Sequence, residues 1–115
     1  MRSIRITYDP EGDILSITFG QSTEATGYQL SDQILLRVNP QTQEVAGLTI
    51  RNFAVHANTA QEIPLPGIDE DLAVKPLLLQ LLSSPPVTHF FRVVKGGQGL
   101  SARLLRPSLQ EALVG

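Results

Sequence analysis

Hydrophobic and polar residues alternate on either side of a short turn near the start of the chain. Apolar side chains occupy every second position over residues 4–8 and again over residues 14–19. Such alternation is typical of strands that bury one face. Between the two runs, Asp9 and Pro10 suit the first positions of a type I turn, and Gly12 suits the left-handed position that closes it. The pattern therefore predicts a β-hairpin with Gly12 in the left-handed conformation.

Three more short strands are predicted in the first half of the chain. Their apolar patterns cover residues 26–30, 34–38 and 44–52. Asn39 and Pro40 begin a second candidate type I turn between the last two of these strands. Connections of a few residues are too short for the crossovers that parallel strands need. We therefore expect an antiparallel β-meander.

The pattern changes after residue 54. Residues 54–67 predict an irregular connector, because its prolines disfavour helix at the positions before them. Residues 75–83 predict a helix whose leucines wrap most of its circumference, so that it needs burial on more than one side. Pro76 either kinks a longer helix or occupies the first turn of a new one, and we favour a break near Val74.

The end of the chain returns to strand patterns. Residues 87–94 and 100–106 predict two strands joined by the glycine-rich turn at residues 95–99. A last short helix is expected where Ser108 and Glu111 have the spacing of a capping box.

These elements predict the α+β class. We expect a mainly antiparallel sheet of five to seven strands, a leucine-rich helix packed on it and a short C-terminal helix. Residues 1–53 form the β-meander motif half, and residues 54–115 form an appended half with a helix, a hairpin and the C-terminal helix. Because each half alone would have a thin core, a single domain over residues 1–115 is predicted.

Composition narrows the classes of function. The net charge of −2 provides no basic field to attract nucleic acid or an anionic membrane. The chain has no cysteine, which excludes disulfides, thiol catalysis and thiolate metal sites and suits a reducing compartment. No apolar run approaches the roughly 20 residues of a membrane span. The first residues enter a strand pattern with no signal-peptide core, so the predicted location is the cytoplasm.

Acidic and imidazole side chains are the first candidates for chemistry. Asp9, Glu11 and Asp13 could line a cation site or an acid–base centre, but calcium takes about six to eight oxygens, and a solvated turn explains the same residues. His56 and His89 are far apart in sequence and lack the spacing of metal ligands. No catalytic residue, metal ligand or cofactor is therefore assigned.

The glycines of residues 95–99 resemble a phosphate-binding loop only in composition. Such a loop needs a helix N-terminus directly after it. The residues that follow have a strand pattern, so a hairpin turn is the better interpretation.

Strand alternation directs three arginines to the outer face of the first sheet. These are Arg5, Arg37 and Arg51, and serines and threonines surround them. Guanidinium groups bind phosphate and carboxylate groups, so the face could receive an anion, nucleic acid or an acidic partner. A solvated antiparallel face has the same composition, and exposed aromatic residues that could stack on bases are not predicted. Nucleic acid is therefore the less favoured partner.

The leucine-rich helix offers a second surface. Leu79 could belong to the core, or it could contact a second copy of the chain, because helices that are apolar all round need two partners. A homodimer contact at Leu79 therefore remains an alternative to burial.

Two motifs of the first half resemble a family of small bacterial proteins that is catalogued only as a domain of unknown function. The motifs are the Tyr8-Asp9-Pro10-Glu11-Gly12-Asp13 turn and, about thirty residues later, the Gly47-Leu48-Thr49-Ile50 strand. The resemblance covers residues 1–53 and implies a β-meander with no established activity. The family often has tyrosine in place of Ser16 and glutamate in place of Thr49. Some relatives are suspected partners of small toxin-like proteins, so the resemblance also allows a protein partner.

Three hypotheses follow for the function. The first is a non-enzymatic protein-interaction module, either as a homodimer or with another protein. The second is an anion or nucleic-acid binder that uses the arginine face, and the third is a small enzyme. An enzyme should have a pocket that contains perturbed titratable groups, whereas an interaction module should expose an apolar patch.

Overall fold

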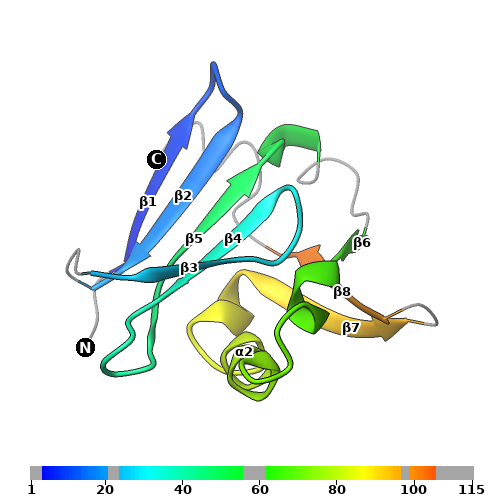
Figure 1. Ribbon diagram of the computed structural model, residues 1–115. Helices are drawn as coiled ribbons and strands as arrows, with labels where there is room; N and C mark the ends of the chain where they lie inside the picture. Colours follow the sequence, from blue (N-terminus) through cyan, green and yellow to red (C-terminus); the bar gives the residue numbers. More distant parts are fainter. Residues whose placement is uncertain (1–3, 21–23, 56–61, 97–98, 106–115) are drawn as a thin grey trace.

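Two antiparallel sheets and a few short helices make up the fold (Figure 1). The computed structural model describes residues 4–20, 24–55, 62–96 and 99–105. The predicted α+β class is confirmed at this level. The predicted single sheet is wrong, because the strands divide into one sheet of five and one of three.

The first sheet has the strand order β1-β2-β5-β4-β3, and every neighbouring pair is antiparallel. Its strands are β1 (Ile4–Asp9), β2 (Ile14–Phe19), β3 (Thr26–Gln29), β4 (Ile34–Val38) and β5 (Val45–Arg51). The predicted β-meander is wrong at one point, because β2 pairs with β5 and not with β3. Alternation fixes which face of a strand is buried but not which strand lies beside it.

The same kind of turn closes the β1–β2 and β4–β5 hairpins. The Asp9 Oδ1 atom accepts the Glu11 N–H at 3.1 Å, and the Asn39 Oδ1 atom accepts the Gln41 N–H at 2.8 Å. A proline follows Asp9 and Asn39, and its fixed φ suits the second position of the turn. Both turns therefore lie where the sequence predicts them.

The left-handed residue of the first turn is Asp13, not Gly12 as predicted. The φ angle of Asp13 is 54°, and the equivalent residue of the second turn, Gln43, has a φ of 59°. Because Asp9 pairs with Ile14, the loop contains four residues and its left-handed position is the last of them. Aspartate tolerates this conformation because its short side chain can form local hydrogen bonds.

A bulge interrupts the β4–β5 ladder at Ala46. Arg37 faces Gly47 whereas Val38 faces Val45, so Ala46 is an extra residue. A Cβ atom on Gly47 would lie 2.8 Å from a backbone carbonyl oxygen of β2. The sheet therefore needs glycine at this position.

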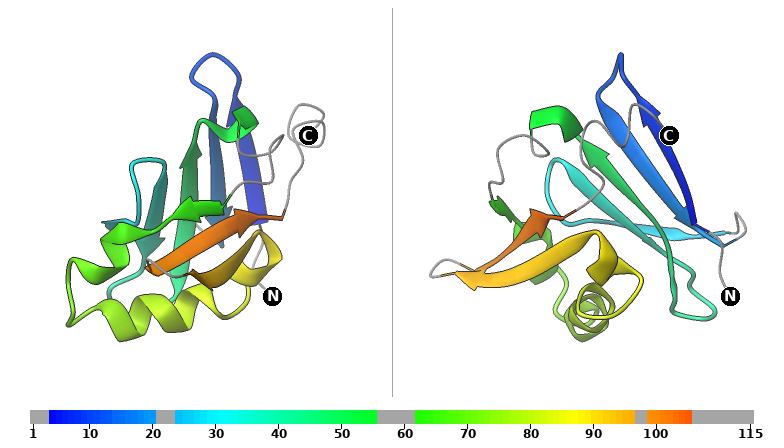
Figure 2. Two further views of the ribbon diagram at one scale, coloured as in Figure 1. Left: turned by 90° about the vertical axis from the view of Figure 1, so that its right-hand side faces the viewer. Right: turned by 180° about the vertical axis from the view of Figure 1, so that it is seen from behind.

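The second sheet has the order β6-β8-β7 and crosses over one face of the first sheet (Figure 2). Its strands are β6 (Glu62–Pro64), β7 (Phe91–Gly96) and β8 (Gly99–Leu104). The helices of this half are the 3₁₀ turns η1 (Pro66–Asp69) and η2 (Val87–His89) and the α-helix α2 (Lys75–Leu82).

Helix α2 begins at Lys75, with a proline in its first turn. The chain therefore starts a new helix here and does not kink a longer one. Leu78 and Leu82 are buried within the core cluster. The C-terminal helix predicted around Ser108 and Glu111 lies outside the residues that the structure describes.

Two boundaries of the second half differ from the prediction. Residues 87–89 were expected in a strand but form η2, and β7 begins only at Phe91. Residues 62–64 were expected in an irregular connector but form β6, which buries Ile63. Proline is tolerated there because β6 is an edge strand.

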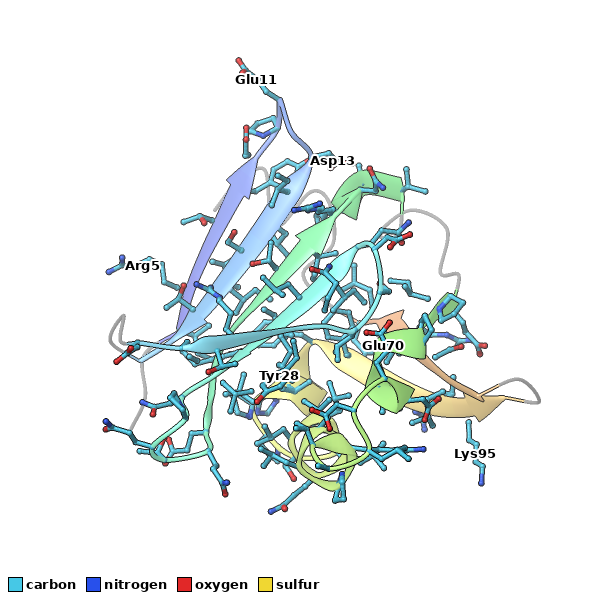
Figure 3. The ribbon with its side chains drawn as sticks, viewed as in Figure 1. Arg5, Glu11, Asp13, Tyr28, Glu70 and Lys95 are labelled. Carbon is cyan, nitrogen blue, oxygen red and sulfur yellow. The ribbon has the colours of Figure 1, made fainter. Side chains whose placement is uncertain are left out.

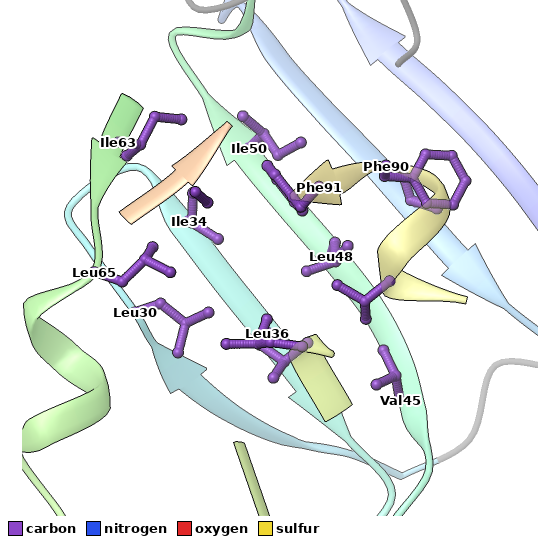
Figure 4. Close-up of a cluster of buried hydrophobic side chains, with 14 of the residues drawn as sticks. Leu30, Ile34, Leu36, Val45, Leu48, Ile50, Ile63, Leu65, Phe90 and Phe91 are labelled. Atoms are coloured by element: carbon purple, nitrogen blue, oxygen red, sulfur yellow. The ribbon is translucent and has the colours of Figure 1, made fainter. Parts of the chain in front are cut away.

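The hydrophobic core lies between the two sheets (Figure 4). The first sheet contributes Leu36, Leu48 and Ile50, and the second half contributes Ile63 and Phe91, all with at most 2% of their surface exposed. Burial of such side chains contributes about 1.5–3 kcal/mol each. The two halves therefore share one core cluster.

Candidate functional site

The β1–β2 hairpin is joined to the end of β5 through Asp13. The Tyr8 hydroxyl donates to Asp13 Oδ1 at 2.7 Å, and the Ala54 N–H donates to the same oxygen at 2.9 Å. Ala54 belongs to a helical turn that begins at Phe53, so the carboxylate caps that turn from a distant strand. The Tyr8 and Phe53 rings meet edge to face, with centroids 5.4 Å apart. Tyr8 and Asp13 of the turn motif therefore stabilise the packing of the hairpin against the end of β5.

The hydrogen bond to the Asp13 carboxylate raises the pKa of Tyr8 above its ordinary value of 10.0. Partial burial and the negative charges of Asp13 and Asp9 act in the same direction. Because the folded-state pKa is the higher one, this stabilisation is fully present below the unfolded pKa and is lost as pH rises through the folded pKa. We expect the difference in melting temperature between the wild type and Tyr8→Phe to shrink above about pH 10, as measured by thermal melts across pH. A difference that stays constant into strong alkali would contradict this assignment.

The three turn carboxylates have different roles and do not form one site. Asp9 accepts a turn N–H, Asp13 accepts the bonds from Tyr8 and Ala54, and Glu11 is exposed at the tip of the hairpin (Figure 3). Among the residues that the structure describes, three histidines or carboxylates that could hold a metal ion are not found together.

The other chemical candidates are placed as follows. His89 is exposed at the end of η2, and His56 lies outside the described residues. Gly96 pairs with Gly99 across β7 and β8, which confirms a hairpin at the glycine-rich segment. Leu79 is half-buried and packs against the core cluster.

The arginines of the outer face are not brought together. The register places Arg5, Thr18, Gly47 and Arg37 in one row across β1, β2, β5 and β4. Arg5 and Arg37 are thus three strands apart, about 14 Å, and Figure 3 shows Arg5 projecting away from the sheet beyond β1. Arg51 lies four residues further along β5, roughly 13 Å from the row. A single small anion cannot contact all three.

Arg37 is the arginine with the most constrained position. Its guanidinium group lies over Gly47, whose absent side chain leaves the space. Its Nε atom is buried and has no hydrogen-bond partner. Buried polar atoms normally have a hydrogen-bond partner. The N–H at Arg37 Nε could therefore donate a hydrogen bond to an acceptor on a bound anion.

The hollows in the part of the chain that the structure describes include three with volumes of about 330, 420 and 140 Å³. None of these three is lined by a histidine. Ser31 lines the first, but its Oγ atom accepts the N–H groups of Gln33 and Ile34 at 3.1 Å and so serves the β3–β4 turn.

The inner face of β1 is less covered than that of the strand beside it. Ile4 is 47% exposed, and Ile6 and Tyr8 are half-buried, whereas Leu15 and Ile17 on β2 are fully buried. Among the residues that the structure describes, the cover over the first sheet is therefore complete at β2 and only partial at β1. Ile4, Ile6 and Tyr8 therefore form a partly exposed apolar surface along β1, the apolar ledge. No described strand pairs with the outer edge of this strand.

The backbone of β1 also presents hydrogen-bonding groups that have no partner among the described strands. The Arg51 N–H donates to Gln33 O at 2.7 Å, so the backbone groups of Arg51 face β4. Along a strand, successive residues direct their N–H and C=O groups to opposite sides. Thr49, like Arg51, therefore faces β4, so its pair on β2, Ser16, faces β1 and pairs there with Thr7. Thr7 therefore faces β2, whereas Ile6 and Tyr8 direct their N–H and C=O groups to the open edge. Sequence reasoning missed this feature.

Comparison with known proteins gives a family match over part of the chain and no activity. No described helix is long and apolar enough to cross a membrane. Neither a curated protein nor a solved structure matches the chain. The family resemblance drawn from the two motifs is confirmed: residues 5–53 match the family described as Protein of unknown function (DUF2283).

Proposed function

We propose that this chain is a non-enzymatic protein-interaction module that binds by adding a partner's β-strand to the open edge of β1. The observation that carries the proposal is the coincidence of two features on one strand. Ile6 and Tyr8 present backbone groups that no described strand pairs with, and the apolar ledge of Ile4, Ile6 and Tyr8 runs beside them.

Strand addition explains both features together. Main-chain hydrogen bonds supply affinity in this mode of recognition, and alternate side chains supply specificity. A six-residue edge strand without proline is otherwise exposed to unwanted pairing. A partner strand would complete the ladder and cover the ledge in one step.

Two proline substitutions in β1 test the proposal. Ile6→Pro removes an N–H that faces the open edge, so we expect the chain to fold but to lose partner binding. Thr7→Pro removes an N–H that faces β2, so we expect it to disrupt the hairpin, because proline fits only the outward-facing positions of an edge strand. Circular dichroism reports folding, and sedimentation and affinity capture report association. Full association of a folded Ile6→Pro protein would refute the proposal.

Anion binding at Arg37 is the second candidate, and it is supported by the unpartnered Nε atom above Gly47. Anion binding is the weaker candidate, because Arg5 and Arg51 lie too far from Arg37 to contact the same small anion. We expect no measurable nucleic-acid binding at physiological salt, because the net charge is −2 and exposed aromatic residues that could stack on bases are not predicted. Tight, salt-sensitive binding in a titration, lost in Arg37→Ala, would make this candidate the leading one.

The proposal also covers the cellular location, the domain organisation and the contact between copies. We place the protein in the bacterial cytoplasm, which is supported by its cysteine-free sequence and by the resemblance of its two motifs to a family of small bacterial proteins. Folding of residues 1–115 as one domain is supported by the shared core cluster. For a contact between copies we favour β1 over Leu79, because β1 also offers backbone groups that no described strand pairs with, whereas Leu79 lies within helix α2.

A further inference from the structure

We infer that the strand added to β1 is β1 of a second copy of this chain, antiparallel to the first about a two-fold axis at Thr7. The inference rests on the proposed function and names its partner. Closed two-fold pairs are the commonest symmetric assemblies, and a two-fold pair needs a surface that is complementary to itself. The six residues of β1, Ile-Arg-Ile-Thr-Tyr-Asp, have that property.

Charge sets the register on the outer face. When Thr7 lies opposite Thr7 of the second copy, Arg5 lies opposite Asp9 of that copy, and Asp9 lies opposite its Arg5. All three side chains are exposed in this structure. Opposite charges and threonine pairs are favourable when they face each other across antiparallel strands. The outer face of β1 is therefore complementary to itself.

The inner face fits the same register. Ile6 lies opposite Tyr8 of the second copy, and Tyr8 opposite its Ile6. A pair of an aromatic and a β-branched side chain is favourable in an antiparallel ladder. Ile6 and Tyr8 are also the residues whose N–H and C=O groups point to the open edge, so these two pairs are the hydrogen-bonded ones.

Neighbouring registers lack this match. An axis at Arg5 places two guanidinium groups opposite each other, which is unfavourable. An axis at Ile6 places Arg5 opposite Thr7 and leaves Asp9 beyond the described strand of the second copy. Only the axis at Thr7 pairs both charges while it keeps Ile6 and Tyr8 hydrogen-bonded.

Single cysteines test the axis directly, because the natural chain has none. In this register the Thr7 pair is a non-hydrogen-bonded one, with Cα atoms about 4.5 Å apart, close enough for a disulfide. We expect Thr7→Cys to give a disulfide-linked dimer under mild oxidation, and Ile6→Cys and Arg5→Cys to remain monomeric on a non-reducing gel. Preferential linkage through Ile6→Cys or Arg5→Cys would overturn the register.

Charge reversal tests the same contact without a covalent bond. Arg5→Glu places like charges opposite Asp9 of the second copy twice per dimer, so we expect the dimer dissociation constant to rise about tenfold at low salt. Arg51→Glu is the matched control, because it makes the same change at an exposed arginine on β5. Equal effects of the two substitutions in sedimentation equilibrium would contradict the pairing.

The failure of this inference is distinguishable from that of the proposed function. A purified chain that remains monomeric up to about millimolar concentration, and whose Thr7→Cys variant does not link, overturns the second copy as partner. The proposed function survives that result if the chain still captures another protein and Ile6→Pro abolishes the capture. The proposed function fails if Ile6→Pro changes neither the capture of another protein nor self-association.

Discussion

Replacing Phe91 with alanine should lower the free energy of unfolding by about 3–5 kcal/mol. Phe91 begins β7, is 2% exposed and lies between the two sheets, near Ile50 (Figure 4). The substitution removes most of a large side chain that covers the first sheet, and surrounding residues relax only partly into such a cavity. Urea denaturation measures the loss.

Leu72→Ala is the matched control for Phe91→Ala. Leu72 is 73% exposed, so its truncation should change the free energy of unfolding by less than about 0.5 kcal/mol. Similar effects of the two substitutions would show that the second sheet does not cover the first in solution.

Replacing Asp13 with alanine should cost about 2–4 kcal/mol of the free energy of unfolding. The carboxylate accepts the Ala54 N–H and the Tyr8 hydroxyl, and the residue has a left-handed backbone. Alanine removes both bonds and does not readily adopt this conformation. Urea denaturation again gives the value.

Asp13→Asn separates the two contributions. Asparagine keeps the side-chain shape and the tolerance for a left-handed backbone but loses the charge of the acceptor. We expect it to retain more than half of the stability that alanine loses. If Asp13→Ala melts like the wild type, the link between the hairpin and the turn at Phe53 is absent in solution.

Local chemistry made the turns predictable. Asp9 with Pro10 and Asn39 with Pro40 specify their turns through side-chain hydrogen bonds and a fixed φ, which depend on neighbouring residues alone. The left-handed residue was placed one position early, because glycine is the usual signal and Asp13 owes its conformation to bonds from Tyr8 and from the distant Ala54. A partner 41 residues away leaves no trace in a local pattern.

Strand order was the part that the sequence could not provide. Alternation correctly put Arg5, Arg37 and Arg51 on one face, but their separation depends on β5 lying between β2 and β4. The open edge of β1 also depends on this strand order, which places β1 at the end of the sheet. It depends as well on the described second half, which covers β2 fully and β1 only in part. The apolar positions of β1 look like those of β2, so a sequence pattern does not distinguish the half-exposed Ile4 from the buried Ile17.

Backbone amide exchange along β1 tests the open edge most directly. In dilute protein we predict slow exchange at Arg5 and Thr7, whose N–H groups face β2, and fast exchange at Ile6 and Tyr8, whose N–H groups face the edge. At concentrations where the chain associates, Ile6 and Tyr8 should become protected while Arg5 and Thr7 change little. If Ile6 and Tyr8 are already protected in the dilute monomer, or still exchange fast in the associated protein, β1 is not the binding edge.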